Sequence, residues 1–594
     1  MLHNDDTKKE IQLRIKIVLS MVLLMMGLLV YYLYFLQVDC HHKYAMLSEK
    51  NRIRLSPLLP KRGRIFTADG KVIASNKYKY TLTLESCAEN VFLENVNLLE
   101  TCIPIEEDEK KEILNTRKKV PRYTPIVVKD GLSWDEYAKL SLIFYKLNHV
   151  SIDYIYVREY AMPLEFSHVI GYATKSDNGL QILMGKTGIE LSKNEELIGE
   201  IGNIKTEINA AGRKMRVLNE VAPVNGNDVV LTLNADLQKY AYDLISQEKA
   251  GACVVLDISN GGVIALVSAP GFDTNLIASK INQDQWNSML SDPLLPLMNR
   301  AVVGTYPPGS IFKIVVAFAA LCEGVITPRD VVYCSGEIAQ DNGVFHCWNR
   351  HGHGRVNVCD ALCMSCDCFF FETSKKLGID KIVEYAEKFG FGKKTGLELS
   401  NESMGLLPSK KWKLLRYGSS WKPYETLITS IGQGALLATL LQTATMLGKL
   451  YAGDYNFAPT LIKSKDESAI KERNPINAKH ATTIKDALYQ VCNAWNGTAV
   501  GSCKTNYGIS GKTGSSQVRK IKTGEAGIGQ KKFPWHLRDH AFFAGVAPHG
   551  NPRYVVAVFI EHGGGGASVA APIARKIFDK LMEIDQKSLE IVPK

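Results

Sequence analysis

The chain has 594 residues, 46% of them hydrophobic and 22% charged, which is too long for one hydrophobic core and predicts two or three domains. Its formal net charge of +10 suits contact with an anionic surface. This composition excludes a disordered chain, and because no RNP, zinc-finger or helix-turn-helix signature accompanies the charge, no nucleic-acid partner is expected.

An uncharged segment, residues 17–38, predicts a transmembrane helix, because it is long enough to cross a hydrocarbon core of ~30 Å. Basic residues precede it and tyrosines lie near its far end, so the positive-inside rule places residues 1–16 in the cytoplasm and the rest of the chain outside. The alternative is a cleaved signal peptide. We do not favour it, because the apolar run exceeds the ~7–15 residues of such peptides and no A-x-A site follows.

The segment after the anchor predicts a polar helical stalk from His41 to about Leu55, followed by a hairpin that turns at residues 68–70. Residues from about 80 to 220 alternate short β-rich runs with charged helical stretches and contain no catalytic constellation. A strand, a turn and an amphipathic helix then follow in residues 221–245, with the helix capped by Asn234 or Asp236.

The pattern changes from Ala250 onwards. Two apolar strands joined by a turn at residues 259–262 open this part, and a hairpin of long strands in residues 540–563 closes it before a final helix, residues 571–584. Helical stretches fill the space between. A sheet built from both ends of the segment, with helices inserted in the middle, predicts an α+β domain.

The strongest chemical signal is the segment around Ser310. Pro307, Pro308 and Gly309 predict a turn, and the apolar run 311–321 predicts a buried helix that begins beside the Ser310 hydroxyl. Lys313 lies on the same helical face, and a lysine in apolar surroundings loses its proton more readily, which suits a base. The pair is the Ser-Lys form of an activated nucleophile. Alone, S-x-x-K is so degenerate that it favours a serine that merely caps a helix; the turn, the apolar helix and two motifs further along the chain favour the nucleophile.

Two further motifs follow in a fixed order. They are Ser365-Cys366-Asp367 and Lys512-Thr513-Gly514, and with Ser310-Ile311-Phe312-Lys313 they resemble the three motifs of the penicillin-binding protein and serine β-lactamase superfamily. Lys-Thr-Gly also occurs at residues 186–188 and 394–396. We choose 512–514, because only this copy has strand-like surroundings and precedes a long hairpin.

Across residues 50–580 the order of segments resembles a class B penicillin-binding protein, with RGRIFTADGKVIASN, SIGQG, WNGTA and GGGGA among the similar segments. S-x-D in the second motif and the insert before it are similar to the penicillin-binding protein 2 subfamily, the elongation transpeptidases. The resemblance implies a pedestal (dimerisation) domain at 50–220 and a penicillin-binding transpeptidase domain at 248–582. A division transpeptidase remains an alternative, as do a β-lactamase and a non-catalytic sensor or scaffold.

The resemblance also implies a mechanism and a location. Lys313 would activate Ser310, Ser365 would relay a proton, and Asp367 and Lys512 would tune that relay. Substrate would lie along the third motif, with its carboxylate on Lys512 and Thr513, beside Gly514, and with the N–H groups of Ser310 and Ser515 forming an oxyanion hole. The implied enzyme is a single-pass inner-membrane protein with a periplasmic catalytic domain. Its partners would be peptidoglycan stem peptides, β-lactams and a membrane-embedded glycosyltransferase.

Cysteines and histidines are concentrated before and inside the second motif. The chain has 13 cysteines, and disulfides are the default in an oxidising compartment, whereas neighbouring histidines favour zinc. The resemblance implies four ligands for one structural zinc ion: Cys334, Cys347, His353 and Cys366. The match is imperfect, because this sequence has Cys334 and Cys347 where the family has carboxylates. Zinc, disulfides and free thiols all remain open, and the acyl transfer itself needs no cofactor.

Overall fold

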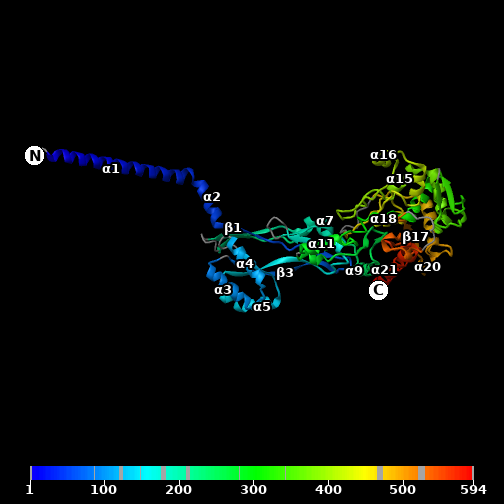
Figure 1. Ribbon diagram of the computed structural model, residues 1–594, viewed down its shortest axis with the longest axis horizontal. Coiled ribbons are helices and arrows are strands. Elements are labelled where there is room, and N and C mark those ends of the chain that lie inside the picture. The colour runs from blue at the N-terminus through cyan, green and yellow to red at the C-terminus, as the bar shows by residue number, and fades with distance from the viewer. Residues whose placement is uncertain are drawn as a thin grey trace. The chain divides into compact units, whose positions relative to one another are not determined.

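The computed structural model describes residues 3–85, 87–119, 125–147, 149–175, 182–208, 214–279, 281–340, 343–463, 472–519 and 529–591 (Figure 1). The chain forms two compact units that interleave along the sequence. The first unit contains residues 1–60, 79–155 and 200–225, and the second contains residues 61–78, 156–199 and 226–594. The predicted pedestal range of 50–220 is therefore shared between the two units.

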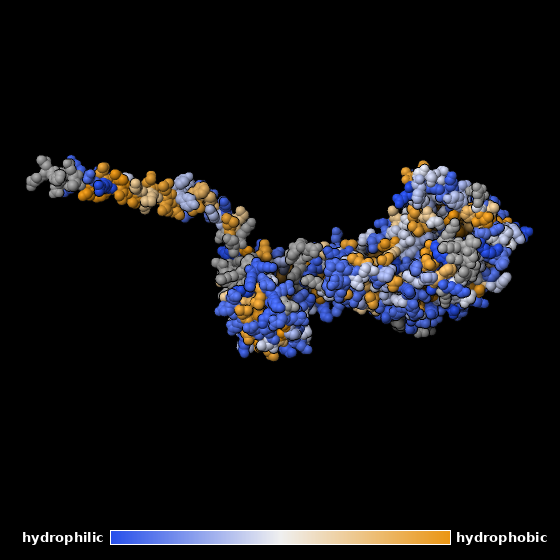
Figure 2. Space-filling view, in the orientation of Figure 1, coloured by the Kyte–Doolittle hydropathy of each residue, from blue (hydrophilic) through white to orange (hydrophobic). Residues whose placement is uncertain are grey.

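The first unit begins with a long apolar helix. Helix α1 (His3–Tyr34) continues into a short π-helical turn, and the stretch Lys8–Asp39 is long and apolar enough to cross a membrane. Figure 2 shows this stretch as mainly hydrophobic. Within the described ranges it is the single helix of this kind, which fits a single-pass anchor. Helix α2 (His41–Arg52) forms the predicted stalk and ends slightly earlier than expected.

The remainder of the first unit combines antiparallel strands with helices. One sheet has the order β1-β8-β9, and strands β3, β4 and β5 belong to a second sheet in which β3 pairs with both others. Apolar side chains such as Leu82, Phe92 and Leu140 form its core. The bounds are β1 (Ile53–Leu58), β3 (Val72–Glu85), β4 (Pro125–Leu132), β5 (Val150–Tyr160), β8 (Gly202–Ile208), β9 (Lys214–Val221), α3 (Glu89–Glu100), α4 (Glu107–Lys119) and α5 (Trp134–Ile143).

The second unit begins with the predicted hairpin turn. Strand β2 (Ile65–Phe66) pairs antiparallel with the start of β3 and parallel with β10 (Val229–Val230). Helix α9 (Ala235–Ser246) starts at Asn234, whose side chain accepts a hydrogen bond from the N–H of Leu237 at 2.9 Å. Asn234, rather than Asp236, is therefore the cap. Short elements complete this part: α6 (Ser167–Ile170), β6 (Ala173–Lys175), β7 (Leu183–Gly185), α7 (Gly188–Ser192) and α8 (Asn194–Ile198).

A five-stranded antiparallel sheet forms the centre of the second unit, in the order β12-β11-β19-β18-β17. It is built from both ends of the segment, as predicted. Alternate side chains of its strands enter two different cores, Val254 and Phe559 on one face and Val255 and Val558 on the other. The bounds are β11 (Gly251–Asp257), β12 (Val263–Ala269), β17 (Ser510–Ser516), β18 (His540–Ala547) and β19 (Tyr554–Ile560).

Helices cover both faces of this sheet, and the α+β prediction is confirmed. Helices α9 and α21 pack in one core, while α12 and α18 pack in the other. The larger helices are α11 (Gln283–Ser291), α12 (Lys313–Cys322), α14 (Asp367–Leu377), α15 (Ile379–Lys388), α16 (Lys410–Tyr417), α17 (Pro423–Ser430), α18 (Leu440–Ala452), α19 (Ala478–Asn493) and α21 (Ala571–Ile591). The smaller ones are α10 (Thr274–Ala278), α13 (Val358–Cys363) and α20 (Val500–Cys503).

The cysteine-rich insert between α12 and α14 folds around two short antiparallel pairs. Strand β13 (Val332–Cys334) pairs with β16 (Gly354–Val356), and β14 (Glu337–Gln340) pairs with β15 (Gly343–His346). These pairings bring the start and the end of the insert together.

Candidate active site

Ser310 lies in a single 3-10 turn, residues 309–311, immediately before α12. The preceding Gly309 has φ +56°, and a Cβ atom there would lie 2.8 Å from the carbonyl oxygen of Ser515. Glycine therefore lets this turn approach strand β17 closely. The Ser310 side chain is half-buried, and its hydroxyl has no hydrogen-bond partner among the described residues. The predicted helix start beside Ser310 is confirmed in position, although its first turn is 3-10.

Lys313 is fully buried at the start of α12, and its amine is held by the second motif. The Nζ atom donates to the carbonyl oxygen of Ser365 at 2.9 Å, to the Ser365 hydroxyl at 3.2 Å and to Asp367 Oδ1 at 2.6 Å. The carboxylate compensates the charge of a buried ammonium group, which would otherwise be costly. In this arrangement the Lys313 amine is directed to Ser365 and Asp367, and Ser310 is not among its hydrogen-bond partners.

The second motif forms the corner between α13 and α14. Ser365 has φ +56°, a left-handed conformation that is uncommon for a serine. Asp367 is the first residue of α14, and its second oxygen, Oδ2, accepts the backbone N–H of Trp348 at 2.8 Å. The carboxylate of Asp367 therefore joins helix α12 to the cysteine-rich insert.

The third motif lies on β17, at the edge of the central sheet. Lys512 is fully buried, and burial together with the charge of Lys313 lowers its pKa well below the ordinary lysine value. The Thr513 hydroxyl lies 2.9 Å from that of Thr498, in the WNGTA segment. Ser515 is exposed, and its hydroxyl accepts the N–H of Gly566 at 3.4 Å.

The other two Lys-Thr-Gly copies have different surroundings. The copy at residues 186–188 lies where α7 begins. The copy at residues 394–396 lies in a loop, where the backbone N–H groups of Thr395 and Gly396 donate to the carboxylate of Glu402. The copy at 512–514 is the one on a strand. Its Gly514 lies close to the turn that carries Ser310, since a Cβ atom there would lie 3.1 Å from the carbonyl oxygen of Pro308.

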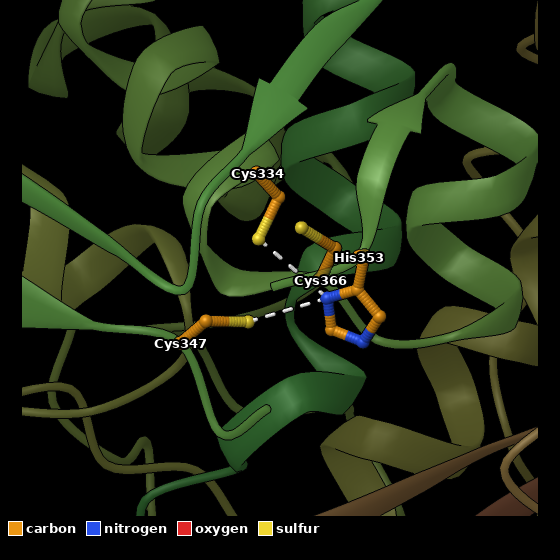
Figure 3. Close-up of side chains that lie close together, drawn as sticks. All are labelled: Cys334, Cys347, His353 and Cys366. Atoms are coloured by element: carbon orange, nitrogen blue, oxygen red, sulfur yellow. Dashed lines mark hydrogen bonds between the residues drawn. The ribbon is translucent and has the colours of Figure 1, made fainter. Parts of the chain in front are cut away.

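The four cysteine and histidine residues of the expected metal set converge (Figure 3). The set is Cys334, Cys347, His353 and Cys366, and its ligand atoms all lie within 4.8 Å of one another. The three cysteines are buried. The Nδ1 atom of His353 is 3.6 Å from the Cys334 sulfur and 3.5 Å from the Cys347 sulfur. All 13 cysteines are free thiols, so the structure contains no disulfide.

The chemistry of this cluster fits a metal ion that prefers sulfur and nitrogen. Side-chain hydrogen bonds lower the pKa of the Cys347 thiol and favour a thiolate. The larger effect comes from Cys366 and the smaller one from Cys368. Three thiols and one imidazole nitrogen form the donor set of closed structural zinc sites. The cluster also borders the second motif, because Cys366 lies between Ser365 and Asp367 and Cys347 precedes Trp348.

Two residues of this region had no assigned role at the level of the sequence. Thr498 contacts Thr513, and Trp348 supplies the N–H that binds Asp367. The WNGTA segment was a usable signal for Thr498, since its resemblance to the family was already apparent. Nothing in the local pattern indicated Trp348, because its contribution is a backbone group.

Comparison with known proteins identifies both parts of the chain. The penicillin binding protein transpeptidase domain matches residues 251–579, and the penicillin-binding protein dimerisation domain matches residues 57–231. The peptidoglycan D,D-transpeptidase MrdA of Salmonella typhimurium is 32% identical over 98% of this chain and 97% of its own length. The MrdA protein of Escherichia coli K12 is 33% identical, over 94% of this chain and 92% of its own length.

Solved structures give the same result. Penicillin-binding protein PBP2 of Helicobacter pylori, in complex with MreC, superposes with a TM-score of 0.79 at 28% identity and covers 90% of this chain and 99% of its own. PBP2 of Pseudomonas aeruginosa, in complex with WCK 5153, superposes with a TM-score of 0.67 at 28% identity, covering 89% and 96%.

Proposed function

The chain belongs to the class B penicillin-binding proteins of the penicillin-binding protein 2 type, and on this premise we propose that it cross-links peptidoglycan during cell elongation through an acyl-enzyme on Ser310. It is a serine-type peptidoglycan D,D-transpeptidase, and this activity needs no cofactor. The observation that supports Ser310 is its position in a turn that approaches strand β17, directly before the helix that begins with the buried Lys313.

The first step is attack on a stem peptide. The Ser310 Oγ forms a bond to the carbonyl carbon of the penultimate D-alanine, and the bond from that carbon to the nitrogen of the terminal D-alanine breaks. Once Lys313 has given up one proton, its neutral amine takes the hydroxyl proton of Ser310, and a proton passes through Ser365 to the leaving amine. The 3.2 Å distance from Lys313 Nζ to the Ser365 hydroxyl supports this relay, and Asp367 holds the amine in place.

The third motif binds the donor peptide in this proposal. The terminal carboxylate of the donor lies against Thr513 and Lys512. The Thr498 hydroxyl, which is hydrogen-bonded to that of Thr513, adds a second hydroxyl beside it. The backbone N–H groups of Ser310 and Ser515 stabilise the oxyanion that forms in the tetrahedral state. Gly514 keeps strand β17 close to the nucleophile turn.

The second step resolves the acyl-enzyme. An amine of a neighbouring stem peptide attacks the same carbonyl carbon, and Ser310 recovers its proton as the cross-link forms; water in place of the amine gives carboxypeptidation. Mass spectrometry of products from a pentapeptide-bearing substrate should detect both the cross-linked peptide and free D-alanine. Ser310→Ala should abolish both products, and cross-linking by that variant at the wild-type rate would refute the proposal.

We also propose that the cluster Cys334, Cys347, His353 and Cys366 binds one structural zinc ion. Zinc would close the insert against the second motif, and its loss would loosen the loop that carries Trp348 and the corner that carries Asp367. Elemental analysis should find about one zinc per chain. Cys366→Ser should lower that content, whereas Cys359→Ser, at a half-buried cysteine outside the cluster, should not. Equal zinc in both variants, or none in the wild type, would contradict the site.

We further propose that the chain resides in the inner membrane with its catalytic domain in the periplasm. Basic residues precede the anchor, and the positive-inside rule places that flank in the cytoplasm. Wall-synthesis partners are supported by the solved complexes, since one neighbour is bound to MreC and another belongs to a peptidoglycan synthase complex. A membrane-embedded glycosyltransferase is the expected partner, and co-purification of such an enzyme with the full-length chain tests this.

A further inference from the structure

The segment between α17 and α18 is bonded to the nucleophile turn. The carbonyl oxygen of Gly432 accepts the N–H of Gly309, the residue before Ser310, at 2.9 Å. Gly432 has φ +74°, and a Cβ atom there would lie 2.0 Å from the Gly309 carbonyl oxygen. Only glycine fits at this contact, so the position of this segment fixes the position of the turn.

The next residue, Gln433, reaches the third motif. Its Nε2 atom donates a hydrogen bond to the carbonyl oxygen of Ser515 at 3.1 Å. Strand β17 is the edge strand of its sheet, with β18 on its other side. Because the N–H and C=O of one strand residue point to the same edge, the N–H of Ser515 faces the same free edge as the carbonyl that Gln433 binds. That edge also faces the Ser310 turn.

Residues 432 and 433 therefore bond to both backbone segments that would supply the oxyanion hole. We propose that Gln433 is a positioning residue for the acyl transfer: it holds Ser515 so that its N–H points at the developing oxyanion. This inference rests on the proposed function. A neutral amide suits this role, because it donates to the carbonyl without placing negative charge near the oxyanion. The benefit is preorganisation, since a donor that is already fixed need not reorganise as charge develops.

Gln433→Met tests the inference, because methionine has a similar length and no N–H donor. Stopped-flow acylation of the full-length protein by a chromogenic cephalosporin gives two quantities, the acylation rate constant and the dissociation constant of the non-covalent complex. Loss of a direct oxyanion donor costs about 10²–10³-fold, so loss of a group that only positions one should slow acylation about tenfold. The dissociation constant should stay within about twofold. Gln433→Glu should be slower still, because its carboxylate repels the oxyanion.

Gln442 provides a matched control. Its Nε2 donates to the carbonyl oxygens of Lys393 and Met404, both at 2.8 Å, and its side chain is fully buried. Gln442→Met should lower the melting temperature yet leave the acylation rate constant of the folded protein unchanged. Wild-type acylation by Gln433→Met would overturn the inference, as would a weaker non-covalent complex that accounts for all of its loss. Failure of the wild-type protein to acylate at Ser310 would instead refute the proposed function, and the inference with it.

Discussion

Replacement of Asp367 by alanine should destabilise the catalytic domain strongly, because it leaves a buried amine without its counter-ion. Asp367 Oδ1 is 2.6 Å from Lys313 Nζ, and the two side chains are 11% and 0% exposed. Removing one partner of such a pair costs about 3–5 kcal/mol. The substitution also leaves the Trp348 N–H without its acceptor. We expect a loss of about 4 kcal/mol.

Differential scanning calorimetry of the detergent-solubilised protein measures this effect. At about 2–4 °C for each kcal/mol, the melting temperature of the catalytic domain should fall by roughly 8–16 °C. The melting temperature of Asp367→Asn should lie between those of the wild type and Asp367→Ala, because the one amide oxygen can accept a hydrogen bond from either Lys313 or the Trp348 N–H but not both. Acylation by penicillin should be slowed in both variants, since the Lys313 amine loses its fixed position.

Two controls separate the ion pair from general damage. Asp360→Ala removes a half-buried carboxylate of the neighbouring helix α13. Among the described residues this carboxylate accepts one hydrogen bond, from the N–H of Asn357 at 3.3 Å, so the substitution should cost about 1 kcal/mol. Adding Lys313→Met to Asp367→Ala should restore much of the stability but none of the acylation, because the uncompensated charge is gone. The reasoning is refuted if Asp367→Ala melts within 2 °C of Asp360→Ala.

Three further substitutions give independent tests. Burial and the charge of Lys313 lower the pKa of Lys512, so Lys512→Met should raise the melting temperature while abolishing acylation, and a lower melting temperature would count against this account. Gly432→Ala should slow acylation at least tenfold, because its Cβ atom would meet a backbone oxygen at 2.0 Å, whereas Gly501→Ala, which faces open space, should not; equal rates would contradict this. Burial lowers the pKa of His540 to about 3, so the folded state keeps the ring neutral. The contribution of this ring to stability is therefore fully present above pH ~6.5. It is lost, at up to about 1.4 kcal/mol per pH unit, as the pH falls towards 3. Thermal unfolding between pH 7 and 5 should therefore be less pH-dependent in His540→Gln, and identical slopes would exclude this role.

The central sheet was predictable from the sequence because its strands carry strong local signals. The runs that form β11, β12, β18 and β19 are almost wholly apolar, since both faces of the sheet are covered, and turns bound them clearly. The same logic selected the correct strand setting for residues 512–514. In contrast, no local pattern marks which compact unit a segment joins. Residues 61–78 and 156–199 belong to the second unit, whereas the predicted pedestal is one continuous range.

The sequence motifs single out candidate residues for the site, but they do not indicate the contacts that these residues make. The motif spacing placed Ser310 at a helix start, yet the partner of the Lys313 amine depends on the left-handed backbone of Ser365, which no sequence pattern indicates. The resemblance named the cysteine and histidine cluster, and the structure brings those side chains together. The bond from Gln433 to Ser515 joins residues far apart in the chain and follows only from the fold.

Mass spectrometry of the full-length protein after incubation with benzylpenicillin tests the central claim most directly. The account predicts one penicilloyl adduct per chain, carried by the peptide that contains Ser310, and no adduct on Ser310→Ala. An adduct on a different residue, or a wild-type protein that remains unmodified by every β-lactam tried, would contradict it.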